Sequence, residues 1–207
     1  MRENGLRARR RRAYRATTDS RHDHPVAENV LGRNFTAENP DQAWVGDITY
    51  IPTAQGWLYL SVLIDLYSRR VVGWAMSGRI DQNLTLTALR MALSQRQPQP
   101  GFVHHTDRGS QYAAGAYQAE LKKAGAVVSM SRKGNCWDNA PSESFFSTLK
   151  TELIHEERFA TRDEAMRAIL RYLLWYNANR LHSSTGYLSP KDYEELERLQ
   201  LTAEQAA

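Results

Sequence analysis

Residues 43–65 read AWVGDITYIPTAQGWLYLSVLID, and this stretch decides the kind of sheet that the chain forms. Its first part, over 43–51, is rich in the β-branched and aromatic residues that favour a strand. A Gln-Gly pair then predicts a short turn, and residues 57–65 predict a second strand. With a third strand expected over 70–77, these short connections predict an antiparallel meander.

The rest of the chain predicts helices alternating with two further short strands. The helix after the meander is expected to begin at Asp81 or Asn83, either of which can cap its first turn. The fold class is therefore α/β, a mixed five-stranded sheet flanked by helices. The later elements are expected to be a strand that ends at Asp107, a helix over 113–124, a strand over 126–130, a polar loop over 131–139, a helix opened by Pro141, a helix over 162–177 and a short helix after Lys191.

The composition is that of a globular protein, with 42% hydrophobic and 24% charged residues among 207. Residues 58–64 (LYLSVLI) are the longest apolar candidate for a membrane span and are too short. Cys136 is the only cysteine, which excludes an internal disulfide and a cysteine-based zinc site and suits a reducing cytosol. We expect a basic, largely irregular arm over 1–38, a core over 39–195 and a C-terminal tail over 196–207.

The positive charge of the chain is concentrated in its first 21 residues. These carry eight arginines against two acids, a net charge of +6, whereas the whole chain carries +4, so the remainder carries −2. The run Arg9-Arg10-Arg11-Arg12 repels itself and is favourable beside a polyanion. We therefore expect these four arginines to bind nucleic acid, even where the arm of the free protein is a disordered, solvated tail.

Three acids stand where a carboxylate needs a compensating partner. Asp47 lies among apolar residues of the first strand, where an isolated charge is costly. Asp107, in HTDRGSQY (105–112), ends the fourth strand, and Glu143 is in the first turn of the helix opened by Pro141. Adjacent positions of the two strands would bring Asp47 and Asp107 to one edge of the sheet, which Glu143 would approach from its helix.

Carboxylates drawn together in this way repel one another, by about 4 kcal/mol for a close pair in a protein environment. A divalent cation removes that cost, and an all-oxygen site favours Mg²⁺ or Mn²⁺ over zinc. Two such ions can activate a water or hydroxyl and stabilise the leaving oxygen of a phosphodiester. The alternatives are structural: Asp47 as an ordinary strand acid, Asp107 as a turn former before Gly109, and Glu143 as a first-turn acid favoured by the helix dipole.

Several neighbouring residues allow both a functional and a structural interpretation. Lys150 follows Glu143 by seven residues, on nearly the same helix face, and can bind a phosphate or remain a solvated lysine. Asp138 lies close enough in the sequence to exchange roles with Glu143. Arg180 either contacts a DNA backbone or caps the last long helix. Trp137, in the polar loop, can stack on a base.

Two further sets of residues are expected to be structural. Asp65 ends the second strand and is expected to pair with Arg69 or Arg70. His104 and His105 stand beside the fourth-strand acid, but the sequence contains no matching Cys and His set for a zinc site. The sequence also lacks a phosphate-cradling glycine loop that ends in Lys-Ser or Lys-Thr, which argues against ATP use.

Five separate segments resemble the DDE transposases of bacterial insertion-sequence family three, within the retroviral-integrase superfamily. The resemblance covers about residues 20–195, and it implies a ribonuclease-H-like fold, Mg²⁺ dependence, and cleavage and joining of DNA at the ends of the element. The segments, which agree with the family in order and spacing, are WVGDITYI around Asp47, LIDLYSRRVVGW over 63–74, HTDRGSQY around Asp107, NAPSESFFSTLKTEL around Glu143 and YNANRLHSSTGYLSP over 176–190.

The resemblance also assigns roles to individual residues. It implies that Asp47, Asp107 and Glu143 form the catalytic and metal-binding triad and that Lys150 contacts DNA. It further implies element ends and target DNA as partners, a homo-oligomer on DNA, and a cytoplasmic location at the bacterial nucleoid without membrane association.

Two departures from the family pattern leave alternatives open. The family's full-length protein has a helix-turn-helix region upstream, and this chain is expected to begin in the basic linker after it, while Thr185 stands where leucine is more frequent. One alternative is a truncated, non-catalytic remnant that binds DNA through its arm. Another is a ribonuclease-H-like nuclease that acts on RNA–DNA hybrids. A helix-turn-helix protein encoded in an upstream frame is a possible partner.

Overall fold

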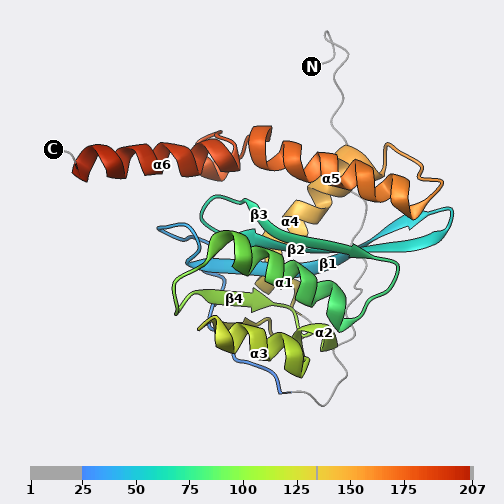
Figure 1. The fold of residues 1–207 in the computed structure, drawn as a ribbon, viewed down its shortest axis with the longest axis horizontal. Coiled ribbons are helices and arrows are strands. Elements are labelled where there is room, and N and C mark those ends of the chain that lie inside the picture. Colours follow the sequence, from blue (N-terminus) through green and yellow to red (C-terminus); the bar gives the residue numbers. More distant parts are fainter. Residues whose placement is uncertain (1–24, 134, 206–207) are drawn as a thin grey trace, which may run out of the picture.

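The computed structural model describes residues 25–133 and 135–205, so the arginine run over 9–12 lies outside the described residues. The described chain forms a five-stranded sheet in the order β3-β2-β1-β4-β5 (Figure 1). The predicted mixed sheet is therefore confirmed. Its strands are β1 (Ala43–Thr53), β2 (Gly56–Asp65) and β3 (Val71–Ser77), which are antiparallel, and β4 (Val103–Thr106) and β5 (Val127–Met130), which continue from β1 as parallel strands.

Helices cover both faces of this sheet and divide its apolar side chains into two cores. Successive strand residues point to opposite faces, so Trp44 packs in the core with α1 to α3, and Val45 packs in the core with α4 and α5. The helices are α1 (Gln82–Arg96), α2 (Ser110–Ala113), α3 (Gly115–Lys123), α4 (Ala140–Leu149), α5 (Arg162–Asn179) and α6 (Pro190–Gln205), with short turns η2 (Cys136–Asn139), η3 (Lys150–Ile154, a π-helix) and η4 (Ser183–Thr185).

Asp81 sets the start of α1, which resolves the choice that the sequence left between Asp81 and Asn83. Its Oδ1 accepts a hydrogen bond from the backbone N–H of Leu84 at 3.0 Å, which satisfies one of the free donors of the first turn. The helix ends at Arg96, where Gln97 adopts a left-handed conformation with φ of 49°. Both ends therefore lie close to the expected positions.

The helix expected over 113–124 corresponds to α3 (Gly115–Lys123), and the short helix α2 precedes it, separated by one extended residue. Ala114 has φ of −62° and ψ of 139°, so α2 ends at Ala113 and α3 begins at Gly115. The break lets the rings of Tyr112 and Tyr117 enter the same core, where each is 1% exposed and they meet edge to face at 5.4 Å.

The irregular segment over 25–38 packs along the outer strand of the sheet. The backbone N–H of Met130 donates to the carbonyl of Glu28 at 3.2 Å, and the N–H of Leu31 donates to Ser129 Oγ at 3.0 Å. The Leu31 side chain is buried in the core that contains α4 and α5. This segment therefore covers part of the β5 edge, which would otherwise present unpaired backbone groups.

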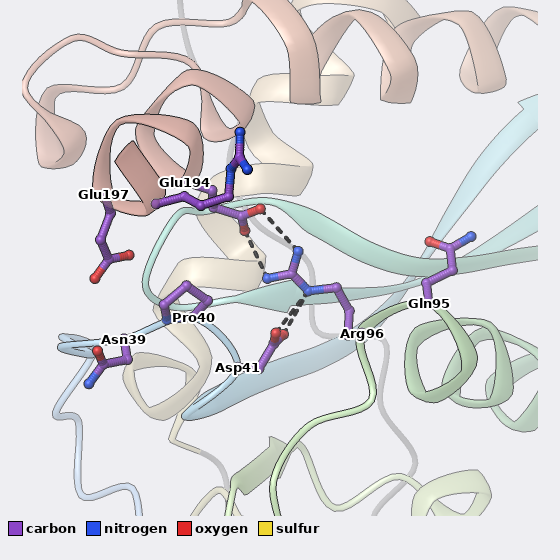
Figure 2. A pocket seen from close by; sticks show the side chains of 8 residues that line it. Asn39, Pro40, Asp41, Gln95, Arg96, Glu194 and Glu197 are labelled. Atoms are coloured by element: carbon purple, nitrogen blue, oxygen red, sulfur yellow. Dashed lines mark hydrogen bonds and ion pairs between the residues drawn. The ribbon is translucent and has the colours of Figure 1, made fainter. Parts of the chain in front are cut away.

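Helix α6 is fixed to the body of the molecule by a network of charged side chains. Figure 2 shows the Arg96 guanidinium between Asp41, at 2.8 Å, and Glu194 of α6, at 2.9 Å. Arg70 also donates to Glu194, at 2.6 Å. The helix then continues across the boundary that we expected at residue 195 and extends beyond the sheet (Figure 1). Among the described residues, no helix is both long and apolar enough to cross a membrane.

His104 and His105 are buried structural residues, as expected. His104 Nε2 lies 2.7 Å from the Tyr117 hydroxyl, and His105 Nδ1 lies 2.8 Å from Ser129 Oγ. Burial, with a smaller contribution from His105, lowers the pKa of His104 from 6.5 to about 3. The imidazole of His104 is therefore neutral in the folded protein at neutral pH.

We expect this buried imidazole to make folding sensitive to acid. Because the unfolded chain binds a proton at His104 near pH 6.5 and the folded chain does so only near pH 3, stability is lost as the pH falls below 6.5. His104 alone should lower the free energy of unfolding by about 2 kcal/mol between neutral pH and pH 5. Urea unfolding should show this loss in the wild type and a smaller loss in His104→Gln, whose amide can still reach Tyr117. An equal loss in both proteins would contradict the assignment.

Candidate active site

The register of the sheet places Asp47 and Asp107 side by side. β1 and β4 are parallel, and their last paired positions are Gly46 and Thr106. The next residues are Asp47 and Asp107, so the two acids occupy matching positions where β4 ends. Two acids that lie 60 positions apart in the sequence are thus brought to one edge of the sheet, as the sequence predicted.

The backbone holds each of these carboxylates in place. Asp47 Oδ1 accepts a hydrogen bond from the N–H of Ile48 at 2.7 Å, and Asp107 Oδ1 accepts one from the N–H of Gly109 at 2.8 Å. The second bond closes a turn after β4, so Asp107 is also the turn former that the sequence suggested. An ionised carboxylate has about four acceptor positions, so a single hydrogen bond of this kind does not fill it.

Glu143 reaches this edge from the first turn of α4. Phe145, Phe146 and Leu149 are buried in the core and fix the helix against the sheet. Glu143 itself is only partly buried, and burial raises the pKa of its carboxyl. Pro141 lies in the first turn of the helix, where its missing N–H leaves no backbone acceptor unpaired.

The three acids interact electrostatically. Burial raises the pKa of the Asp47 carboxyl well above its ordinary value, and the negative charges of Asp107 and Glu143 raise it further. The positive charge of Lys150 acts in the opposite direction. Three carboxylates and one ammonium group therefore gather at one place, where the negative charge is in excess.

The chemistry of these groups fits a divalent cation. Carboxylate oxygens are the ligands that Mg²⁺ and Mn²⁺ prefer, and a cation would relieve the repulsion that raises the pKa of Asp47. In the part of the chain that the structure describes, no three His, Cys, Asp or Glu side chains already form a closed metal-binding cluster. The acids are therefore neighbours whose side chains must move closer to share an ion.

Lys150 lies beside the acids at the start of the π-helix η3. Its Nζ stands 5.0 Å from the centre of the Tyr50 ring, a distance that permits a cation–π interaction. Burial lowers the pKa of this ammonium group, and the negative charge of Asp47 opposes that shift. Insertions of π-helix are frequent at functional sites, and this one begins at the residue that the sequence singled out.

Asn139 is a site residue that the sequence interpretation missed. Its Nδ2 donates to the carbonyl of Gly46 at 3.4 Å, so it connects the start of α4 to the strand position before Asp47. Its Oδ1 is buried and has no hydrogen-bond partner among the described residues. The only sequence signal was its place four residues before Glu143.

Tyr112 lies buried behind the two aspartates. Burial raises the pKa of its hydroxyl well above 10, and the negative charges of Asp47 and Asp107 raise it further. The hydroxyl is therefore protonated at neutral pH. This residue is the last of the HTDRGSQY stretch, and its ring anchors the turn that follows Asp107.

Asp138 does not take the place of Glu143. Its side chain is fully buried, and its carboxylate accepts hydrogen bonds from Arg132 and Arg33, each at 2.7 Å at the shortest. The bond from Arg132 is the main cause that holds the pKa of Asp138 far below its ordinary value. An acid with two guanidinium partners has a structural role, so the exchange that the sequence left open is not supported.

Asp65 is structural, as expected, but its side-chain partners differ from those predicted. It accepts hydrogen bonds from the backbone and hydroxyl of Ser68 at 3.0 and 2.9 Å, and from the N–H of Asp41 at 3.0 Å. Arg69 bonds to Asp65 only through its backbone N–H, and Arg70 pairs with Glu194. Burial raises the pKa of Asp65 to about 6 despite these donors.

Arg180 occupies the cap at the end of α5. Its guanidinium pairs with Glu152 at 2.9 Å and lies 5.9 Å from the centre of the Tyr176 ring. These contacts favour the capping interpretation over a free phosphate-binding side chain.

One hollow of the described chain lies apart from the three acids. A hollow between α6 and the start of β1 is lined by Asn39, Pro40, Asp41, Arg96 and Glu194, among others, and contains none of the three acids (Figure 2). It is the seam along which α6 attaches to the body.

The chain matches two protein-family descriptions. Residues 37–136 match the Integrase core domain, and residues 124–190 match a second family with the same description. The chain is 47% identical over 191 residues to the IS600 uncharacterized 31 kDa protein of Shigella sonnei, which covers 92% of the chain and 70% of that protein. It is 47% identical over 195 residues to transposase InsF of IS3A from Escherichia coli, with 94% and 68% covered. The transposase of IS904 from Lactococcus lactis is 49% identical over 167 residues, with 80% and 66% covered.

Solved structures of retroviral proteins have a similar fold. A chain of the simian T-cell lymphotropic virus intasome, solved with the PP2A regulatory subunit B56 gamma, matches with a TM-score of 0.62 at 18% identity, over 80% of this chain and 56% of that one. The dimeric HTLV-2 integrase catalytic core domain, solved with magnesium, matches with a TM-score of 0.54 at 18% identity, over 70% and 92%. These matches confirm the predicted ribonuclease-H-like fold.

Proposed function

Because the chain belongs to the IS3 family of insertion-sequence transposases with an integrase core domain, we propose that Asp47, Asp107 and Glu143 are its catalytic and metal-binding triad. The function of the family is that of a transposase, a polynucleotidyl transferase. For this chain we propose DNA strand cleavage at the ends of an element, followed by transfer of the freed end to a target.

The register of β1 and β4 is the observation that carries this proposal. It places Asp47 and Asp107 at matching positions, and the charges of Asp107 and Glu143 both act on Asp47. An arrangement that raises the pKa of a carboxyl by repulsion is costly unless a positive ligand compensates for it. A functional site is the simplest reason for keeping such an arrangement.

Each residue of the site can be given a role in phosphodiester chemistry. Asp47, Asp107 and Glu143 would hold Mg²⁺ or Mn²⁺, for which we propose two ions, and such ions stabilise the charge that develops on phosphodiester oxygens. Lys150, supported by the Tyr50 ring, would bind a phosphate beside the acids. Asn139 would keep α4 at a fixed separation from β1, so that Glu143 stays opposite the aspartates. We invoke no serine or tyrosine nucleophile, because water and then a DNA 3′-hydroxyl serve as attacking groups.

A nicking and joining assay tests this function. The purified chain should nick supercoiled DNA and produce joined strands with Mg²⁺, and a chelator should abolish both products. DNA binding without products under either condition would identify a non-catalytic remnant instead. Faster cleavage of an RNA–DNA hybrid than of a DNA duplex would favour the ribonuclease alternative.

We propose that the arginine arm adds sequence-independent affinity for DNA. Each phosphate contact makes log K fall with log salt concentration by about 0.9, so replacing Arg9, Arg10, Arg11 and Arg12 with alanine should reduce the slope by about 3.6. Fluorescence anisotropy over a salt series measures the slope. A slope that is the same in the variant and the wild type would remove the arm from DNA binding.

The active assembly is proposed to contain several copies of the chain on DNA. Asp47, Asp107 and Glu143 form one site, whereas transposition requires reactions at two element ends.

The three relatives above are 66 to 70% covered by this chain, and a helix-turn-helix partner from an upstream frame would supply recognition of the ends. Because the proposed substrate is bacterial DNA, we propose that the protein acts in the cytoplasm, at the nucleoid. Sedimentation with and without DNA would test for the assembly.

A further inference from the structure

Trp137 is held out into solvent beside the active site. Its side chain is 70% exposed, whereas the next two residues, Asp138 and Asn139, are 0% and 4% exposed. All three belong to the short turn η2, which leads directly into α4 and Glu143. An exposed indole next to buried polar residues is unusual, because burying so large an apolar surface is normally favourable.

The backbone at Trp137 is fixed by the carboxylate of Asp138. That carboxylate accepts three hydrogen bonds from Arg132, through its backbone N, Nε and Nη2 at 2.9, 2.9 and 2.7 Å. It accepts two more from the segment over 25–38, one from Arg33 Nε at 2.7 Å and one from Asn29 Nδ2 at 3.0 Å. Trp137 is therefore presented from an anchored turn, and a ligand that stacks on it has less conformational entropy to remove.

The residue that follows Trp137 is the centre of a positively charged group. Two guanidinium groups share the single carboxylate of Asp138, so the group carries a net charge of +1 at neutral pH. The side chains of Arg132 and Arg33 remain 55% and 43% exposed. An exposed aromatic ring next in the chain to a carboxylate shared by two exposed guanidinium groups suits a nucleobase with its phosphates better than an apolar protein surface.

We propose that Trp137 stacks on an unpaired nucleobase at the DNA end in the active site, while Arg132 and Arg33 contact the adjacent phosphates. A base inside a duplex is already stacked on both sides, so only a frayed or displaced base can use the indole. This inference rests on the proposed function, because it assigns a position to the end of the same DNA substrate. The turn η2 would thereby favour DNA ends whose terminal bases are unpaired.

The test compares two DNA probes, a fully paired duplex and the same duplex with unpaired terminal bases, one of which is 2-aminopurine. The full chain carrying Asp107→Asn is used so that cleavage does not consume the probe. Trp137→Ala should weaken binding of the frayed duplex by about tenfold and abolish the change in 2-aminopurine fluorescence, with little effect on the paired duplex. Trp137→Phe, which keeps an aromatic face, should retain most of the preference.

Tyr187→Ala is the matched control, because Tyr187 is also 70% exposed and lies on the loop before α6. It should leave both affinities unchanged. If Trp137→Ala weakens both duplexes equally, or neither, stacking on an unpaired base is refuted. A change in sedimentation of the DNA-free protein, with unchanged binding of both probes, would mean that Trp137 contacts protein and would also overturn the proposal.

The binding readout separates this inference from the proposed function. If the wild type prefers frayed ends through Trp137 but never nicks DNA with Mg²⁺, the catalytic proposal fails and the stacking proposal stands. If the wild type nicks DNA and Trp137→Ala leaves the preference for frayed ends intact, only the stacking proposal fails.

Discussion

Asp107→Asn is expected to lower DNA nicking and joining by about a thousandfold or more, because it removes one of the negative ligands on which charge stabilisation at the site depends. The substitution preserves shape, and its Oδ1 can still accept the hydrogen bond from Gly109 that closes the turn after β4. The fold should therefore survive while the chemistry is lost. Asp47→Asn should have the same effect on activity, measured as the initial rate of nicking of supercoiled DNA with Mg²⁺.

Asp47→Asn should raise the stability of the fold although it lowers activity. The Asp47 carboxylate is destabilised by burial and by the charges of Asp107 and Glu143. Without divalent ions, Asp47→Asn should therefore raise the free energy of unfolding by about 1 kcal/mol. A gain in stability together with a loss of activity is the expected signature of a functional site.

Glu120→Gln provides the control for both measurements. Glu120 pairs with Arg90 on the surface between α3 and α1, away from the acidic edge. Its replacement should leave the nicking rate unchanged and should change the free energy of unfolding by less than about 1 kcal/mol. Nicking rates of Asp107→Asn that equal those of the wild type would refute the assignment of the triad.

Gly73→Ala is expected to be the most destabilising of the small substitutions, by about 3 kcal/mol or more. Gly73 lies in β3 where α1 crosses the sheet. A Cβ atom there would stand 2.3 Å from the backbone oxygen of Ala88 and 2.8 Å from the Cβ of Ala92. Neither neighbour is the flexible end of a side chain, so the helix and the strand must separate and lose packing throughout this core.

Gly115→Ala is the matched control for that experiment. Gly115 begins α3, and a Cβ atom built there meets no other atom within 4 Å. Alanine should be neutral or slightly stabilising at this position, because it reduces the freedom of the unfolded chain. Urea unfolding of both variants measures the difference. Similar stability of Gly73→Ala and the wild type would mean that α1 does not pack against β3 at the described separation.

The sequence could predict the parts of the site that depend on chain neighbours. The strand that carries Asp47, the turn after Asp107 and the helix that carries Glu143 all follow from local patterns of apolar residues, turn formers and a first-turn proline. The cap at Asp81 was one of two candidates that the same reasoning allowed. Alternation along β1 is likewise local, because successive strand residues face opposite sides.

The roles of Asp138 and Asn139 could not be predicted in this way. The partners Asn29 and Arg33 of Asp138 are more than a hundred residues away in the sequence, and no local pattern records such a contact. The sequence therefore presented Asp138 as a possible substitute for Glu143.

The sequence by itself determined which elements form and which acids they carry, because hydrophobic periodicity and capping act between residues that are close along the chain. Tertiary structure alone decided the register that pairs Gly46 with Thr106 and the neutralisation of Asp138 by two arginines. These outcomes depend on strand register and on packing between distant segments. The physical reason is that the free energy of a long-range contact depends on the whole fold, and local sequence preferences do not contain it.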